Sequence, residues 1–227
     1  MNSPFLATGL SVSSGISTPV YRPRVCGKFI FAGDQKIYIR GVTYGTFGPS
    51  ADGHQYPTPD IVARDFALMA TNNINAVRTY TVPPRWLLDL AHEHSLWVMV
   101  GLPWEQHITF LDDPQRTRTI EQQVRTAVKA CAGHPAVLCF SVGNEIPSPI
   151  VRWHGARRVE RFIKRLYRAV KSEDPSALVT YVNYPTTEYL NLSFLDFCAS
   201  MCSSKIGTAS RLISRGCKTS QVRSLCF

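Results

Sequence analysis

Short apolar runs alternate with amphipathic segments through most of the chain. The apolar runs predict strands over 36–44, 74–80, 96–102, 136–145 and 177–184, and a sixth strand that begins over 192–197. Helical spacing of apolar residues predicts helices over 60–69, 85–94, 115–132 and 151–173, the first of them capped by Asp60. Strands separated by helices of this length pair in parallel through right-handed crossovers. The pattern therefore predicts an α/β fold with a parallel sheet.

The fourth strand ends on the most informative pair of residues, Asn144-Glu145. The run before it, 136–143, is typical of a strand buried on both faces, and Ile146-Pro147 follow the pair. In a barrel of parallel strands, side chains at the carboxyl ends point into the mouth, where loop-built active sites lie. A carboxylate at this place indicates catalysis, and an Asn before it can hold a sugar hydroxyl or orient the acid.

Three segments carry a resemblance to a known group of enzymes: Ile39-Arg40-Gly41-Val42, Asn75-Ala76-Val77-Arg78 and Gly143-Asn144-Glu145. They make residues 28–197 similar to the first half of a (β/α)8 glycoside hydrolase. The group is the retaining clan that includes the family 2 β-galactosidases, β-mannosidases and β-glucuronidases. The resemblance implies a partial TIM barrel with about strands one to five and the start of a sixth. It also implies a carbohydrate substrate and no cofactor.

The same resemblance implies roles for three residues. Glu145 is the expected general acid/base, and Asn144 is the expected contact to the sugar 2-hydroxyl. Arg78 matches the Arg that braces a nucleophilic Glu at the end of a seventh strand. The plainer interpretations are a buried structural carboxylate for Glu145 and a core ion pair for Arg78.

The loop after the third strand adds two candidates for substrate binding, Trp104 and Glu105. Trp104 could stack on the apolar C–H face of a sugar ring, or it could fill the rim of the barrel. Glu105 could accept a hydrogen bond from the substrate, or it could pair with Arg78. Tyr44 and Tyr80, after the first and second strands, are weaker candidates.

The two ends of the chain depart from the barrel pattern. Residues 1–23 predict a flexible segment, and 24–198 form the barrel part. Residues 199–227 hold five Lys or Arg, three Cys and no acid, without a helical or strand period. Read out of frame from the third base of codon 198, with allowed synonymous codons, they give CFNVFLENWNGFEAYLARLQNLAGEVPLF, which continues a barrel pattern. We therefore expect a frameshift near codon 198; a natural basic tail is the alternative.

The expected frameshift has a consequence for activity. Retaining hydrolysis needs two carboxylates about 5–5.5 Å apart, one as acid/base and one as nucleophile. The nucleophile is expected just beyond the shifted segment, so this chain is expected to hold half of an active site and to be inactive. Three alternatives stay open: a carbohydrate-binding barrel fragment without turnover, part of a hydrolase-glycosyltransferase fusion, and an unrelated α/β protein with a chance Asn-Glu.

Composition narrows the remaining function classes. The net charge of +9 falls to +4 without the five cations of 199–227, and much of the rest lies over 152–171 at helical spacing, which is typical of a solvated helix face. We therefore expect no nucleic acid partner. The seven cysteines show no metal-ligand spacing, and His92-Glu93-His94 face different sides of a helix, so no metal site is expected. The absence of a signal peptide and of an 18-residue apolar run predicts no membrane span and a cytoplasmic location.

Overall fold

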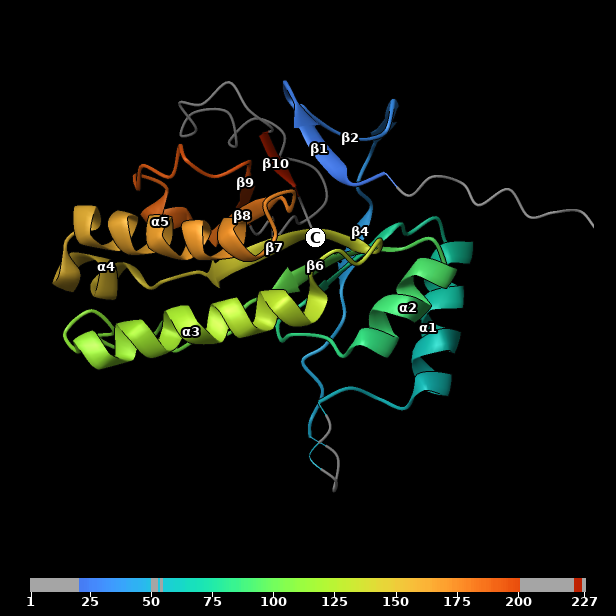
Figure 1. Ribbon diagram of the computed structural model, residues 1–227, viewed down its shortest axis with the longest axis horizontal. Coiled ribbons are helices and arrows are strands. Elements are labelled where there is room, and N and C mark those ends of the chain that lie inside the picture. Colours follow the sequence, from blue (N-terminus) through green and yellow to red (C-terminus); the bar gives the residue numbers. More distant parts are fainter. Residues whose placement is uncertain (1–20, 50–52, 54, 201–222, 226–227) are drawn as a thin grey trace, which may run out of the picture.

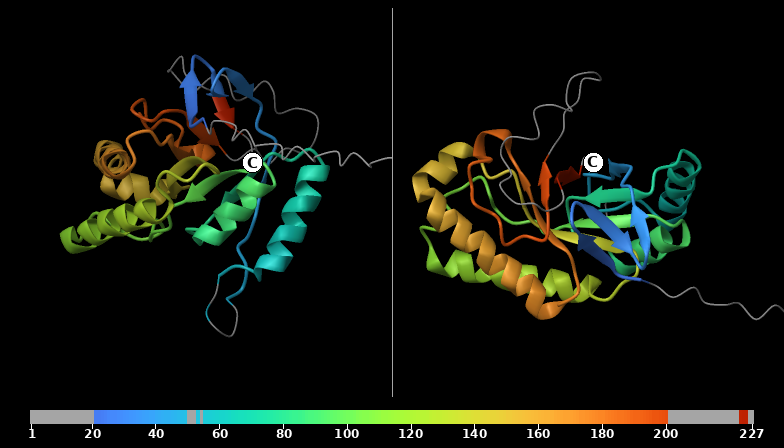
Figure 2. Two further views of the ribbon diagram at one scale, coloured as in Figure 1. Left: turned by 45° about the vertical axis from the view of Figure 1, so that its right-hand side comes forward. Right: turned by 90° about the horizontal axis from the view of Figure 1, so that it is seen from above.

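The computed structural model of the protein describes residues 21–49, 53, 55–200 and 223–225. Its main element is a seven-stranded sheet in the order β10-β9-β8-β7-β6-β5-β4, in which all neighbouring strands are parallel. From β4 to β9 the strands lie side by side in the order of the sequence, and the sheet curls (Figure 2). Such a sheet is part of a barrel wall. The prediction of an α/β fold with a partial TIM barrel is confirmed.

Most strands lie where the apolar runs predict them. They are β4 (Gly41–Thr43), β5 (Ala76–Thr79), β6 (Trp97–Gly101), β7 (Val137–Asn144), β8 (Val179–Asn183), β9 (Cys198–Ser200) and β10 (Arg223–Leu225). The predicted sixth strand is present as β9, and its start is corrected to Cys198, directly after the predicted segment 192–197. Leu192, Leu195 and Phe197 are buried in the segment that leads to it, and this burial explains their apolar pattern.

The predicted first strand, 36–44, is in fact two strands in different sheets. β1 (Pro23–Cys26), β2 (Phe29–Ala32) and β3 (Gln35–Ile37) form a separate antiparallel sheet, in which Ile37 pairs with Ile30. The turns between these strands contain Gly27 and Gly33, with left-handed φ of 58° and 57°. Strands this short leave too little alternation for the sequence to separate β3 from β4.

Helices α1 (Pro59–Thr71), α2 (Arg85–Glu93) and α3 (Pro114–Cys131) lie on one side of the sheet, and β1 and β2 lie on the other (Figure 1). The prediction of one helix over 151–173 is corrected to two, α4 (Ser148–His154) and α5 (Ala156–Glu173). Gly155 separates them with a φ of 81°, which a continuous helix does not allow. A short 3-10 helix, η1 (Pro185–Thr187), follows β8.

The N-caps of α1 and α3 are Thr58 and Asp113. Thr58, rather than the predicted Asp60, is the N-cap of α1, and Asp60 lies in the first turn, where a negative charge favours the helix amino end. The N-cap of α3 is Asp113, whose side chain accepts a hydrogen bond of 2.8 Å from the Gln115 N–H.

Alternating strand residues face two separate cores. Val98 and Val100 of β6 pack with the helices in the larger core, whereas Met99 faces the inside of the curled sheet. The inner core also contains Leu138 and Leu178, near the amino ends of β7 and β8, together with Ile30 of β2. The small antiparallel sheet therefore covers the inner face toward the amino ends of the strands and leaves the carboxyl ends, the mouth, to the loops.

Two sequence predictions concern residues that are largely outside this description. Residues 1–20 and 201–222 are not among the described residues, so the flexible segment and the out-of-frame tail stay predictions. Within the tail range, β10 pairs in parallel with β9, and Arg223 stands opposite Cys198. Among the described helices, none combines the length and the apolar character needed to cross a bilayer.

Candidate active site

The carboxyl end of β7 is irregular at Asn144-Glu145. From Ser141 to Asn144 the chain takes three steps along β7 while its neighbour β8 takes two, from Thr180 to Val182. Glu145 then has a φ of 55°, in the left-handed region that non-glycine residues seldom occupy. An extra residue in a strand re-aims the side chains that follow it. Strained backbone of this kind clusters at functional sites.

Three successive amide groups fix the backbone that carries Glu145. The acceptors are Gln106 Oε1 for the Asn144 N–H (2.5 Å), the Val182 carbonyl for the Glu145 N–H (2.8 Å) and the Tyr181 hydroxyl for the Ile146 N–H (2.8 Å). The two side-chain acceptors are themselves buried, Gln106 at 7% and Tyr181 at 1% exposure. The backbone that carries the half-buried Glu145 side chain is therefore held rigidly.

Gly143 makes this close packing possible. A Cβ at this position would lie 3.0 Å from Gln106 Oε1 and 3.0 Å from the Tyr181 ring. A side chain would therefore push away the two groups that hold the Asn144 and Ile146 amides.

Arg78 reaches the same place from β5. Its side chain is 3% exposed, and one Nη donates a 2.5 Å hydrogen bond to Asn144 Oδ1. The guanidinium also lies 4.7 Å from the centre of the Tyr80 ring. Burial lowers the pKa of Arg78, and the neighbouring Tyr80, Glu145 and Cys139 groups oppose that shift. The structure thus brings together Arg78 and Asn144, which lie on separate strands. Glu145 is close enough for its charge to affect the pKa of Arg78.

The two candidates from the loop after β6 have other surroundings. Trp104 is 9% exposed, donates from Nε1 to the Val142 carbonyl (2.9 Å), and meets the Phe110 ring edge-on at 4.9 Å between centres. This packing favours the rim-filling interpretation of Trp104 over sugar stacking. Glu105 is exposed and forms its ion pair with Arg116 of α3 (3.7 Å), rather than the pair with Arg78 that the sequence left open.

Of the two weaker candidates, Tyr80 lies at the site, because its ring supports the Arg78 guanidinium. Tyr44 points elsewhere. Its hydroxyl donates to Asp65 Oδ2 on α1 (3.0 Å), and burial raises the pKa of the phenol. Tyr44 therefore belongs to the packing between the sheet and the helices.

The sequence places Gln106 after the third strand, at the mouth, and Gly143 in one of the three motifs, but it did not predict the supporting contacts of Gln106, Tyr181 and Gly143. Gln106 is a single polar residue in a loop, and Tyr181 stands in a strand where an aromatic is ordinary. Neither gives a signal, since their role depends on contacts between β7 and its neighbours. The Gly directly before Asn144-Glu145 was the available clue, because Gly within a strand often marks a bulge or a close approach.

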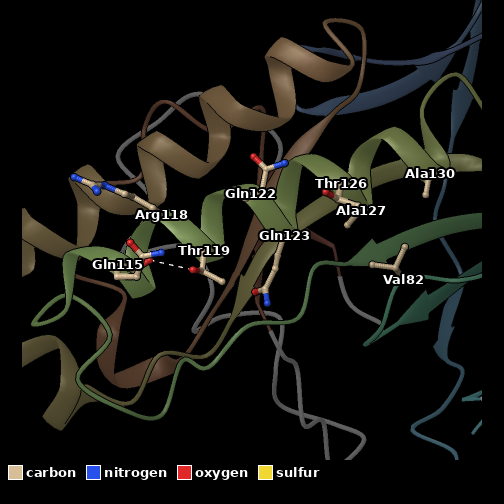
Figure 3. A pocket seen from close by; sticks show the side chains of 9 residues that line it. All are labelled: Val82, Gln115, Arg118, Thr119, Gln122, Gln123, Thr126, Ala127 and Ala130. Carbon is tan, nitrogen blue, oxygen red and sulfur yellow. Dashed lines mark hydrogen bonds between the residues drawn. The ribbon is translucent and has the colours of Figure 1, made fainter.

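Other features of the described residues lie away from this site. A groove of about 760 Å³ runs along α3 beside Val82, and its lining side chains are uncharged apart from Arg118 (Figure 3). No cluster of three or more His, Cys, Asp or Glu is placed to hold a metal within the described part of the chain. Burial raises the pKa of the Cys131 thiol to about 11, which keeps it protonated at neutral pH.

A parallel wall whose strands follow the order of the sequence, with Arg78, Asn144 and Glu145 at its mouth, defines part of a (β/α)8 barrel domain. The sequence profile described as "Glycosyl hydrolases family 2, TIM barrel domain" matches residues 24–213. The chain belongs to glycosyl hydrolase family 2, and the resemblance inferred from its three motifs is confirmed.

Individual relatives agree with this assignment. The β-galactosidase of Vibrio cholerae serotype O1 is 34% identical over 154 residues, which cover 65% of this chain and 14% of that protein. A β-glucuronidase from Ruminococcus gnavus in complex with uronic isofagomine matches 80% of this chain and 32% of its own, with a TM-score of 0.64 and 17% identity. A β-glucuronidase from Bacteroides uniformis matches 80% of this chain and 23% of its own, with a TM-score of 0.64 and 19% identity. The solved structures share the fold, and the chain spans about a seventh of the length of the Vibrio relative.

Proposed function

We propose that this barrel segment serves a retaining β-glycoside hydrolase in which Glu145 is the general acid/base. The observation that carries the proposal is the fixed, left-handed backbone at the end of β7, which presents Glu145 beside Asn144 and Arg78. The substrate is a carbohydrate, in keeping with the family. Glu145 protonates the leaving oxygen in the first step and takes a proton from the attacking water in the second.

Asn144 and Arg78 act as a pair in this proposal. Because Asn144 Oδ1 accepts from Arg78, the Asn144 side-chain NH2 is oriented to donate to a sugar hydroxyl. Arg78 is buried, and a buried cation favours the ionised form of a neighbouring carboxylate. An ionised carboxylate is the form that a nucleophile needs.

The nucleophile is not assigned to a described residue. By the resemblance it belongs to the end of a seventh strand, at about 5–5.5 Å from the acid/base carboxyl group. We infer that the 227-residue chain alone binds sugar without turnover. Translation in the shifted frame after Cys198, continued into the downstream gene, supplies the second carboxylate.

The test compares the 227-residue chain with the longer version translated in the shifted frame. We expect hydrolysis of nitrophenyl β-glycosides by the longer version alone. In that version Glu145→Gln lowers turnover of alkyl glycosides by about 10²–10⁴-fold, the range for loss of a general acid. The loss is smaller for nitrophenyl glycosides, whose leaving group needs little protonation. Glu93→Gln, at an exposed position at the end of α2, is the matched control and leaves turnover unchanged.

Three results would contradict parts of this proposal. Equal losses on alkyl and nitrophenyl glycosides would make Glu145 a structural carboxylate. Sugar binding by the longer version without hydrolysis would favour the carbohydrate-binding alternative. Stop codons in the shifted frame would remove the frameshift hypothesis. The cytoplasmic location stays a prediction that cell fractionation checks.

A further inference from the structure

Three exposed aromatic side chains follow the carboxyl ends of β7 and β8. They are Trp153 on α4, Tyr184 directly after β8, and Tyr189 after η1, with exposed fractions of 69%, 43% and 58%. α4 packs against η1, so the two segments that carry these rings are neighbours. β7 runs toward the end of the molecule at which α4 lies (Figure 1). The aromatic side chains therefore belong to the rim on the same end of the sheet as Glu145.

The Trp153 indole is held in one orientation. Its Nε1 donates a 2.7 Å hydrogen bond to Asp112 Oδ2, from the loop after β6. This hydrogen bond is the main cause that holds the pKa of Asp112 below its usual value. The other Asp112 oxygen lies 3.5 Å from Nδ1 of the buried His154. With its one polar atom bonded to Asp112, Trp153 offers its ring surface to a partner.

The chemistry around these rings fits a sugar better than a protein partner. Protein interfaces have a contiguous apolar centre, and exposed apolar patches that mark them cover hundreds of Å². Here exposed charged residues flank the aromatic side chains along the chain, with Arg152 directly before Trp153 and Glu188 directly before Tyr189. A pyranose ring has apolar C–H faces and a hydroxyl edge, so it uses both kinds of side chain at once.

We propose that Trp153, Tyr184 and Tyr189 form an aromatic rim that binds the sugar units of a β-linked oligosaccharide beyond the unit at Glu145. The inference rests on the proposed function, since it names the substrate class of the same site. It makes the substrate a chain of several sugars rather than a single glycoside with a small leaving group. The rim supplies binding, and Glu145 supplies the chemistry.

Binding to the 227-residue chain tests the aromatic rim without any need for turnover. The probes are cellotetraose, β-1,4-galactotetraose, β-1,4-mannotetraose and xylotetraose, with the corresponding methyl β-glycosides as one-unit controls, measured by isothermal titration. We expect at least one tetrasaccharide to bind, and Trp153→Ala to weaken it about tenfold, as loss of one aromatic stacking contact implies. Tyr189→Ala weakens it less, and Trp153→Phe restores most of the affinity.

Tyr38→Ala is the matched control, because Tyr38 is 64% exposed but precedes β4, at the opposite end of the strands. It leaves tetrasaccharide binding unchanged. All variants replace exposed rings, and thermal unfolding checks that each stays folded. Tyr189→Ala tests the rim independently of Trp153.

The outcomes separate this inference from the function on which it rests. If no tetrasaccharide binds, or if Trp153→Ala and Tyr189→Ala both bind as tightly as the parent chain, the aromatic rim is overturned. If Glu145-dependent hydrolysis of nitrophenyl glycosides persists in that case, the proposed function stands without the rim. If tetrasaccharides bind through the rim while Glu145→Gln leaves hydrolysis by the longer version unchanged, the proposed function fails and the rim stands.

Discussion

The two ends of the sheet are built in different ways. At the amino ends of β7 and β8, the buried Asp174 carboxylate accepts from Arg22, from the Ser176 hydroxyl (2.8 Å) and from the Gly133 N–H (3.2 Å). At the carboxyl ends, the half-buried Glu145 stands on a left-handed backbone beside Arg78. At the amino ends, the Asp174 carboxylate has several hydrogen-bond partners and its backbone is in a common conformation. At the carboxyl ends, the Glu145 carboxylate stands on a strained backbone.

This difference assigns stability to the amino ends of the strands and the geometry of the candidate site to their carboxyl ends. Arg22 also donates to the His134 carbonyl (3.1 Å), so one side chain joins the segment before β1 to the loops before β7 and β8. Such cross-links contribute stability at the end of the barrel where catalytic loops are absent. The mouth, by contrast, gives up some stability for the geometry of the site. Substitutions at the two ends should therefore separate unfolding from function.

The largest stability effect is expected at the amino ends. Asp174→Ala leaves the partly buried Arg22 and the Gly133 N–H without their acceptor, which costs about 3 kcal/mol. For a chain of this size the melting temperature falls by roughly 6–12 °C. Thermal unfolding measures the loss, and Asp34→Ala is the control, because Asp34 is fully exposed in its ion pair with Arg24. Equal effects of the two substitutions would show that the Asp174 contacts contribute little.

Gly143→Ala should affect both stability and the site. The new Cβ presses on Gln106 Oε1 and the Tyr181 ring, and overpacking of this kind costs about 2 kcal/mol. If Gln106 moves, the Asn144 N–H loses its acceptor, and the backbone that carries Glu145 is no longer held in place. We expect tetrasaccharide binding to weaken along with stability. Gly48→Ala is the matched control, since a Cβ there meets nothing within 4 Å. Unchanged binding in Gly143→Ala would argue that the Gln106 contact does not shape the site.

A smaller effect is expected at Glu145 itself, where one substitution should relieve backbone strain rather than add to it. Glu145→Gly and Glu145→Ala both remove the carboxylate, but only glycine adopts a φ of 55° without strain. We expect the Gly variant to be more stable than the Ala variant by about 1 kcal/mol in denaturant unfolding, although both lack the carboxylate. Equal stabilities would mean that the left-handed conformation carries no strain.

The sequence predicts the wall of the barrel better than its ends. Parallel strands buried on both faces leave continuous apolar runs, and β5 to β8 were found from these runs. The antiparallel sheet β1–β3 was missed because its strands have three or four residues and join the β4 segment without a break. The division of 151–173 was missed although Gly155 was a visible signal, because the apolar spacing continues across it.

At the site, the sequence locates residues that follow strands and misses those that support them. Arg78, Asn144 and Glu145 are found because position at a strand end fixes their place at the mouth, and the roles proposed for them await the tests above. Trp104 also follows a strand, but its burial depends on Phe110 and Phe162, from elements that pattern alone does not bring together. Gln106 and Tyr181 depend in the same way on the register between β7 and its neighbours.

The smallest expected effect concerns acid conditions and His154, just beside the aromatic rim. Burial lowers the pKa of His154, the facing Asp112 raises it, and Arg158 lowers it further. The folded chain therefore takes up this proton less readily than the unfolded chain. Stability contributed by neutral His154 is present above the unfolded pKa of 6.5 and is lost as pH falls below it.

His154→Leu should make the unfolding free energy less dependent on pH between 7 and 5. The substitution also removes Nε2, which accepts a 3.4 Å hydrogen bond from the Leu111 N–H, whereas Nδ1 has no hydrogen bond in this structure. The loss of the Leu111 contact lowers stability by a similar amount at every pH, so the slope reports the titration of His154. The change in slope stays below the value for one full proton, about 1.4 kcal/mol per pH unit. Urea unfolding at a series of pH values measures it, with His92→Leu, at an exposed position on α2, as the control. An unchanged slope in His154→Leu would place the acid sensitivity in other groups, and a steeper slope would mean that protonated His154 stabilises the fold through Asp112.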